Sequence, residues 1–368
     1  MNMGKKAILL FSMIVFVHDS KSQIITDSTI IKNLIQANNS SQLQIQQLSK
    51  EIFDLKQQLQ KQQRQGLNKF ISTSDFLDVA ISSANNLQTL ILKESYRNKI
   101  ASINNPTSNE LGFNLEIEIQ NALKPLLQKA KNTNNSKFGQ VVGSLLETGK
   151  RSPGSLFPAG NVFTSIISMV GNLAVKERGI EQQDLDNFIK SIEKYFNQYE
   201  GLYQSNLVFN ADMEKIRDKL KLLQDDIRVL LQDIILSMDK TVKRQQIKSL
   251  SSEDLMLKYF DTKKIDAVMS RPGVKDEMQF PQDAIKSCKE IANDIQRIYN
   301  EYTTIYNINF QEIKNIISNS RILSSSVDHA QLNKTLKDLE KLYNESKSMD
   351  TDNLRLKTLF DRLEAITQ

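Results

Sequence analysis

Hydrophobic residues recur every three or four positions along most of this chain, and in three stretches their spacing is heptad. The first stretch covers residues 28–65, where eleven glutamines fill the faces outside one narrow apolar stripe. That stripe consists of Ile31, Leu34, Ile45, Leu48, Ile52, Leu55 and Leu59. The polar residues at its a and d positions are Asn38 and Ser41. Because a 3.5-residue repeat keeps one stripe facing a partner helix, we predict a coiled-coil helix whose register Asn38 can fix.

The second and third heptad stripes lie in the C-terminal half of the chain. The second consists of Met213, Ile216, Leu220, Leu223, Ile227, Leu230 and Ile234, and it is widened by Leu222, Val229, Leu231, Ile235 and Leu236. The third consists of Cys288, Ile291, Ile295, Ile298, Tyr302 and Ile305, and it then shifts by one residue to Tyr306, Phe310, Ile313 and Ile317. These stripes predict long helices that pack against other helices, the second on more than one side.

Shorter helical patterns connect these stretches. We predict a break at Gly66, a helix over residues 75–103, another from near Ser108, and a helical hairpin after residues 324–326. The helix at 75–103 places Phe76, Ala80, Ala84, Leu87 and Ile91 on one face. The predicted fold is therefore all-α: an elongated antiparallel bundle of long helices with coiled-coil character and a central apolar helical hairpin.

The central hairpin is the apolar, glycine-rich segment at residues 138–175. We predict two short helices, over residues 138–147 and 161–177, joined by a loop that contains Lys150, Arg151, Pro153 and Pro158. Its candidate site residues are Val141, Val142, Leu145, Leu146, Leu156, Phe157, Val162, Phe163, Ile166, Ile167, Met169, Val170 and Leu173. Three interpretations stay open: a core hairpin clamped between the long helices, a membrane-inserting head, and a docking surface for another protein.

The membrane interpretation has specific support and one obstacle. Small residues such as Gly143 and Gly171 permit close helix contact in lipid, and Lys150 and Arg151 are candidate contacts to anionic headgroups. However, the uncharged run over residues 161–175 is shorter than the roughly twenty residues of a full span. We therefore expect that one molecule does not form a pore alone.

The N-terminus has the layout of a secretory signal. Lys5 and Lys6 precede an apolar run over residues 7–17, and Ser20 and Ser22 provide small residues near a cleavage point. We divide the chain into a signal peptide (1–22), N-terminal helices of the bundle (23–137), the apolar hairpin or head (138–178) and C-terminal long helices of the same bundle (179–368). The expected location is outside the cytoplasm: periplasmic, cell-surface or secreted.

Composition argues against nucleic-acid binding and against a disulfide-stabilised fold. The formal net charge is +5, and removal of the signal leaves +3, close to neutral for a chain of this length. Nucleic-acid binders usually carry a concentrated basic face. Cys288 is the only cysteine, so no disulfide forms within the chain and stability must come from packing.

The residues that usually carry catalysis are scarce. The two histidines are His18, within the signal, and His329, which we expect in a surface loop. A two-histidine metal site is therefore impossible in the mature chain, and Cys288 at a heptad a position is interpreted as a small core residue. The pairs Glu116/Glu118 and Asp225/Asp226 are interpreted as parts of solvated faces. We predict no enzymatic activity, no cofactor and no metal.

The order of these features resembles the cytolysin A and haemolysin BL family of α-helical pore-forming toxins. The likeness is one of layout over most of the mature chain, without a residue motif: an export signal, long heptad helices, a central apolar head, then more long helices. It implies a five-helix rod whose head enters a membrane as soluble monomers become oligomers. It places that head at residues 141–146 and 161–175.

Two functions follow from the sequence. The first is a non-enzymatic exported helical-bundle protein that acts in binding or scaffolding, through a protein partner or through self-association of its helices. The alternative is a pore-forming or membrane-inserting protein that uses residues 138–178, with a lipid membrane as its partner.

Overall fold

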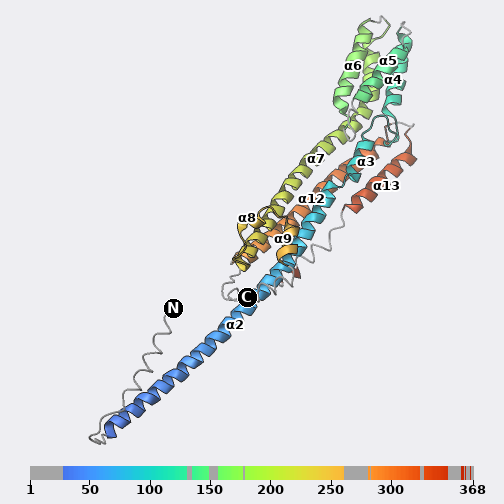
Figure 1. Ribbon diagram of the computed structural model, residues 1–368. Coiled ribbons are helices and arrows are strands. Elements are labelled where there is room, and N and C mark those ends of the chain that lie inside the picture. Colours follow the sequence, from blue (N-terminus) through green and yellow to red (C-terminus); the bar gives the residue numbers. More distant parts are fainter. Residues whose placement is uncertain are drawn as a thin grey trace. The chain divides into compact units, whose positions relative to one another are not determined.

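The computed structural model describes residues 28–130, 135–148, 156–176, 179–260, 281, 283–323, 327–346, 358, 359, 361 and 365. Every regular element among these residues is an α-helix, which confirms the all-α prediction. With the labels of Figure 1, they are α2 (Ser28–Leu92), α3 (Ser95–Ile103), α4 (Leu115–Lys129), α5 (Asn135–Thr148), α6 (Ala159–Lys176), α7 (Gln182–Met238), α8 (Arg244–Ile247), α9 (Ser252–Tyr259), α12 (Ala284–Ser320) and α13 (His329–Glu345). The predicted signal peptide, and Lys150, Arg151 and Pro153 of the predicted loop, lie outside the described residues.

The chain divides into two compact units, residues 1–64 and 65–368. The boundary falls inside α2, which continues through Gly66, so the break predicted there is wrong. A single glycine in a helix costs only about 1 kcal/mol relative to alanine, and the good helix formers on both sides outweigh that cost. After Leu92, a short interruption separates α2 from α3, within the stretch predicted as one helix over residues 75–103.

In the second unit, the long helices α7 and α12 run side by side (Figure 1). The Ser205 hydroxyl donates to the Glu312 carboxylate, and Lys219 forms an ion pair with Glu301. A later residue of α7 thus meets an earlier residue of α12. The two helices are therefore antiparallel, as predicted. Their facing sides carry the second heptad stripe, which is buried throughout, and the third, which is buried apart from the half-buried Ile305. Leu222 and Val229, predicted to widen the buried face, are instead 65% and 48% exposed.

Other helices cover α7 and α12. Helices α4 and α6 pack against α7, α5 packs against α4 and α6, and α13 packs against α12 and α3. The part of α2 in this unit buries Phe76, Ala80, Ala84, Leu87 and Ile91, as its spacing predicted. The core is thus one continuous cluster built from these helices.

The loop between α3 and α4 needs one glycine. Gly112 has φ +73°, and a Cβ there would lie 2.8 Å from the carbonyl oxygen of Asp328. The Asp328 amide donates to the Gly112 carbonyl over 2.8 Å, which ties the loop to the start of α13. Helix α4 begins at Leu115 rather than near Ser108, because the Asn114 side chain accepts from the Ile117 amide at 3.2 Å and so caps it there.

A buried polar cluster joins three helices in the middle of this unit. The Asn309 amide on α12 donates to the hydroxyl of Ser205 on α7 at 2.9 Å and to the Ser205 carbonyl at 3.2 Å. The hydroxyl of Tyr96 on α3 donates to the Asn309 carbonyl oxygen at 3.0 Å. All three residues are less than 9% exposed. Buried polar groups that are paired in this way fix how the helices dock, since any shift would leave them unpaired.

Candidate functional site

The apolar segment forms α5 and α6, which lie with α4 beside the first half of α7 (Figure 1). The Phe163 ring packs against Phe196 of α7, with 5.0 Å between ring centroids. The Phe157 ring meets Tyr199 edge-on at 5.7 Å. The Gly160 amide donates to Glu200 Oε2 at 2.9 Å, just inside the start of α6. The hairpin is therefore attached to α7 by both ring packing and a charge-assisted hydrogen bond.

The candidate residues of this segment divide by burial. Those that are buried are Val142, Leu146, Phe157, Val162, Ile166 and Val170. Those that are half-buried are Leu145, Leu156, Phe163, Ile167, Met169 and Leu173. Val141 is 45% exposed. One face of the hairpin thus belongs to the core of the second unit. The buried residues of α5 and α6 recur with the spacing that is typical of an amphipathic helix.

Gly143 and Gly171 do not mark a close approach of a neighbouring helix backbone here. A Cβ added to Gly171 would meet no other heavy atom within 4 Å, and one added to Gly143 would lie 3.4 Å from Glu116 Oε1. No helix in the described part of the chain is long and apolar enough to cross a membrane.

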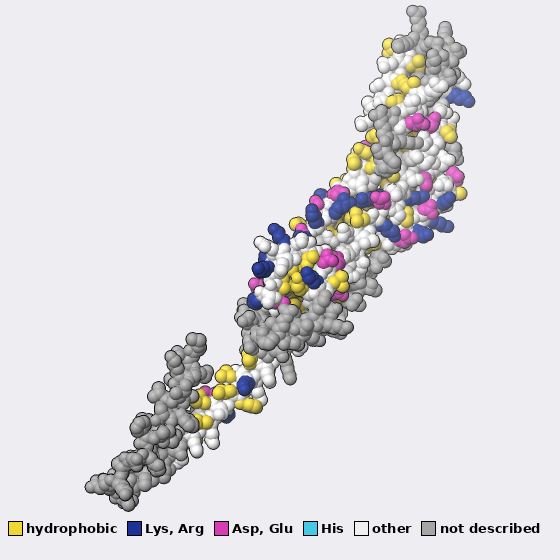
Figure 2. All heavy atoms as spheres, in the orientation of Figure 1, with side chains coloured by type: hydrophobic (Ala, Val, Ile, Leu, Met, Phe, Trp, Pro, Cys, Tyr) yellow, Lys and Arg dark blue, Asp and Glu magenta, His cyan; other side chains and the backbone are white. Residues whose placement is uncertain are grey.

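The first heptad stripe has a different environment. Its members whose side-chain exposure the structure describes are Ile45, Leu48, Ile52, Leu55 and Leu59, and we call these five residues the α2 stripe. Their exposed fractions lie between 47% and 63%. Figure 2 shows hydrophobic side chains at the surface of this part of α2. Soluble proteins rarely expose so many large apolar side chains in one row, so the α2 stripe is the candidate interaction surface of this chain.

Sequence spacing located the α2 stripe but not its exposure. Heptad spacing predicts that a stripe faces a partner helix, without saying whether that helix belongs to the same chain. The sequence reasoning also passed over two further hydrophobic residues on α2, Leu43 and Phe53, which are 66% and 60% exposed. They lie outside the heptad a and d positions, and only their size and apolar character among glutamines distinguishes them.

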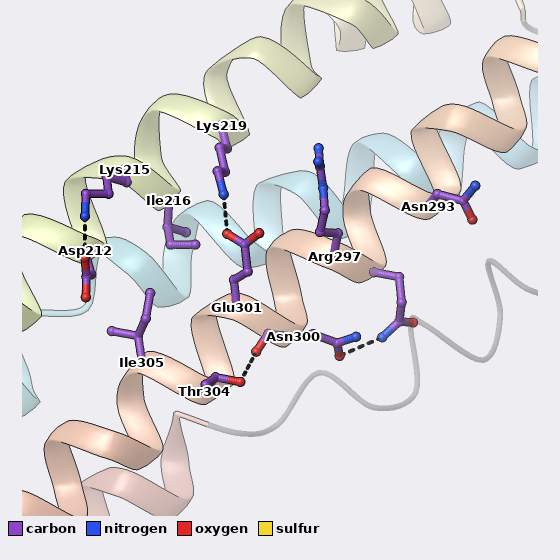
Figure 3. A pocket seen from close by; sticks show the side chains of 11 residues that line it. Asp212, Lys215, Ile216, Lys219, Asn293, Arg297, Asn300, Glu301, Thr304 and Ile305 are labelled. Atoms are coloured by element: carbon purple, nitrogen blue, oxygen red, sulfur yellow. Dashed lines mark hydrogen bonds and ion pairs between the residues drawn. The ribbon is translucent and has the colours of Figure 1, made fainter.

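A groove of about 630 Å³ lies between α7 and α12 (Figure 3). Its charged lining residues are all paired: Lys215 with Asp212, Lys219 with Glu301, and Arg297 with Asp294. Its polar residue Thr304 donates to the Asn300 carbonyl at 2.7 Å, as the dashed line shows. Because these lining charges already neutralise one another, the groove offers no unpaired charge to a ligand.

Cys288, the candidate nucleophile, and His329, the candidate acid–base residue, have different environments. Cys288 is fully buried, and burial raises the pKa of its thiol to about 12, so the reactive thiolate is not populated near neutral pH. His329 is exposed, as expected, but it is the first residue of α13 rather than part of a loop, because Asp328 caps the helix there. No group of three or more histidine, cysteine, aspartate or glutamate residues within the described ranges is arranged to hold a metal ion.

The carboxylate pairs named from the sequence do not converge on a cavity. Glu116 and Glu118 are in the first turn of α4, where negative charge favours the helix N-terminus. Asp225 pairs with Arg228 at 2.8 Å. The pKa of Asp226 is raised by partial burial and by the neighbouring carboxylates Asp294, Asp225 and Glu290. The raised pKa therefore follows first from burial and second from the like charges along α7 and α12.

Comparisons with protein-family models, with curated proteins and with solved structures find no match to this chain.

Proposed function

We propose that this protein is a non-enzymatic, exported helical-bundle protein that acts outside the cytoplasm in binding or scaffolding. It does so by association of its helices with a protein partner. The single observation that carries this proposal is the α2 stripe, a heptad row of large apolar side chains that are 47–63% exposed on a helix otherwise rich in glutamine.

Burial of this stripe by a partner is energetically favourable. Complete burial of a leucine or isoleucine contributes about 1.5–3 kcal/mol, and these five side chains are each roughly half exposed. A partner helix along the stripe would therefore contribute roughly 5 kcal/mol before the entropy cost of association is subtracted. The apolar side chains that the partner buries against the stripe add to this gain and help it exceed the entropy cost of association, and the glutamines around the stripe keep the free helix soluble.

The burial of α5 and α6 favours binding over membrane insertion. Insertion of residues 138–178 would remove Ile166, Val170 and Phe157 from a core in which they are at most 2% exposed. Their contacts with α7, including the ring pair Phe157–Tyr199, would be lost at the same time. The membrane would have to compensate for all of these contacts, whereas association through the α2 stripe disturbs none of them.

Two further features support the other parts of the proposal. Export is proposed from the charged, apolar and small-residue pattern of residues 1–22. The absence of enzymatic activity is proposed from the scarcity of histidine in the sequence and from the buried Cys288 thiol, whose pKa is raised to about 12.

The proposal predicts the size of the native protein outside the cytoplasm. In gel filtration of the untreated extracellular fraction, we expect the wild type to elute in a complex larger than one chain. Ile52→Asp should elute as a monomer, because it places a charge in the α2 stripe. Phe53→Asp is the matched control: the neighbouring side chain is 60% exposed but outside the stripe, so this variant should stay in the complex.

Monomeric wild-type protein in that fraction, or a complex that Ile52→Asp leaves intact, would contradict the binding role of the α2 stripe. Protein confined to the cytoplasm would contradict the exported location.

A further inference from the structure

We infer, on the basis of the function proposed above, that the partner of the α2 stripe is a second copy of this chain. The two α2 helices lie parallel and in register, as a two-stranded coiled coil over residues 41–59. Three properties of this part of the helix indicate a second copy as the partner. They are the residue types at the a and d positions, the charges beside these positions, and the polarity of the remaining faces.

The residue types at the seam positions are those of a parallel dimer. Within residues 41–59 the a positions hold Ile45, Ile52 and Leu59, and the d positions hold Leu48 and Leu55 after the polar Ser41, so two of three a positions are isoleucine and two of three d positions are leucine. Isoleucine at a with leucine at d favours two parallel strands, because each position orients its side chain differently into the facing helix. Isoleucine at both positions, or the reverse order, would favour three or four strands.

The charges beside the seam select both the partner and its direction. Among residues 41–59, the e positions are Gln42, Ser49 and Lys56, and the g positions are Gln44, Glu51 and Gln58. In a parallel dimer each g residue faces the e residue five positions later on the partner, so Glu51 of each copy meets Lys56 of the other. In an antiparallel pair, e faces e and g faces g, so Glu51 and Lys56 never meet. The only two charged flanking residues therefore form two symmetric ion pairs in the parallel arrangement alone.

The faces outside the seam show that one partner helix is enough. In residues 39–61 the b, c and f positions hold mostly glutamine, serine, lysine and aspartate, all exposed. The exceptions are Leu43, at an f position, and Phe53, at a b position, which lie on the outer side of the helix, about 15 Å apart along its axis, and do not extend the stripe. A single two-stranded seam therefore buries the whole α2 stripe.

Disulfide trapping tests both the partner and the direction. We take the purified full chain at about 100 µM, above the dissociation constants of weak interfaces, under mild oxidation. Leu48→Cys and Leu55→Cys, made separately, should each form a covalent dimer, because facing d residues come within disulfide range. In an antiparallel pair a residue meets its own copy only at the two-fold axis, so no more than one of these two positions could cross-link.

The controls come from the same helix. Leu43→Cys and Phe53→Cys replace equally exposed hydrophobic residues outside the seam, and they should remain uncross-linked. Wild-type protein should also remain uncross-linked, since Cys288 is fully buried. None of the four substituted positions contributes to the buried core, so each variant should fold as the wild type does.

Charge exchange tests the ion pairs independently, by sedimentation equilibrium. In the Lys56→Glu variant, Glu51 of each copy faces the new glutamate of the other copy, so both ion pairs become repulsive. This should weaken dimerisation about tenfold at low salt. Glu51→Lys alone should weaken it by a similar factor. The double exchange Glu51→Lys with Lys56→Glu should restore the wild-type dissociation constant.

The outcomes separate this inference from the proposed function. Cross-linking at both Leu48→Cys and Leu55→Cys, with rescue by the double charge exchange, is the expected result. Cross-linking at only one position, or at neither, would overturn the parallel dimer. If neither position cross-links but the Ile52→Asp variant still elutes as a monomer from the native extracellular fraction, the partner is a different protein and the proposed binding function stands. If neither position cross-links and Ile52→Asp also leaves the complex intact, both the parallel dimer and the binding role of the α2 stripe are wrong.

Discussion

Ile166→Asp is expected to destabilise the second unit by at least about 4 kcal/mol. Ile166 is fully buried on the face of α6 that packs into the core of this unit. A carboxylate there would be removed from water, and burial of an unpaired charge is among the most costly of single substitutions. Thermal denaturation followed by circular dichroism should show a melting temperature lower by about 10 °C or more.

Ser168→Asp is the matched control for this substitution. Ser168 lies two residues further along α6 on the opposite, exposed side, so the same charge there should change the stability by less than about 0.5 kcal/mol. A small effect of Ile166→Asp, similar to that of Ser168→Asp, would mean that the hairpin is held loosely. That result would favour the membrane-inserting head that the sequence left open.

Asn309→Leu should cost about 2–4 kcal/mol, although it replaces a polar residue in the core by an apolar one. The Asn309 side chain accepts from Tyr96 at 3.0 Å and donates to Ser205 at 2.9 Å, and all three residues are buried. Leucine would leave the Tyr96 hydroxyl without this acceptor and the Ser205 carbonyl without this donor. Chemical denaturation monitored by circular dichroism would measure the loss in the free energy of unfolding.

The control for Asn309→Leu is Asn315→Leu on the same helix. Asn315 is exposed, so its replacement should change the stability by no more than about 0.5 kcal/mol. Equal and small effects at both positions would show that the Tyr96–Asn309–Ser205 cluster does not hold α3, α7 and α12 together.

The heptad spacing of hydrophobic residues alone predicted the packing of α7 against α12, where both partners are long helices. The stripes beginning at Met213 and Cys288 are buried against one another and their neighbours because α7 and α12 are antiparallel and keep the same sides facing over many turns. Leu222 and Val229 were assigned to the same buried face and are exposed. Hydrophobicity without periodicity was the weaker guide at these two positions, since no helix among the described residues covers that side of α7 there.

Local sequence signals were less reliable than periodicity at helix ends. Gly66 did not end α2, because helix formers on both sides outweigh one glycine. Helix α4 begins only at Leu115, where Asn114 caps it, although Ser108 is also a capping residue type. Ser108 instead donates to the Ser102 carbonyl in the last turn of α3 and to the Asn105 carbonyl in the loop that follows. The choice between two capping residues depends on the loop's tertiary contacts, including those of Gly112, which the sequence does not reveal.

The candidate site could be located from the sequence only in part. The α2 stripe was found by its heptad spacing, but its exposure is a property of the folded chain. Asn309 was missed entirely, although it lies between Tyr306 and Ile313 on an otherwise apolar face. A polar residue at such a position is a signal of a buried hydrogen-bond cluster, and it could have been read as one.

The central claim, that the α2 stripe contacts another protein chain, is tested most directly by photo-crosslinking in the native setting. A photoreactive amino acid at Ser49 would lie beside the stripe without disturbing it, and one at the adjacent Lys50 would point away from it; both positions are exposed. The account predicts discrete covalent adducts to a protein from position 49 and none from position 50. No adduct from position 49, or the same adducts from both positions, would contradict it.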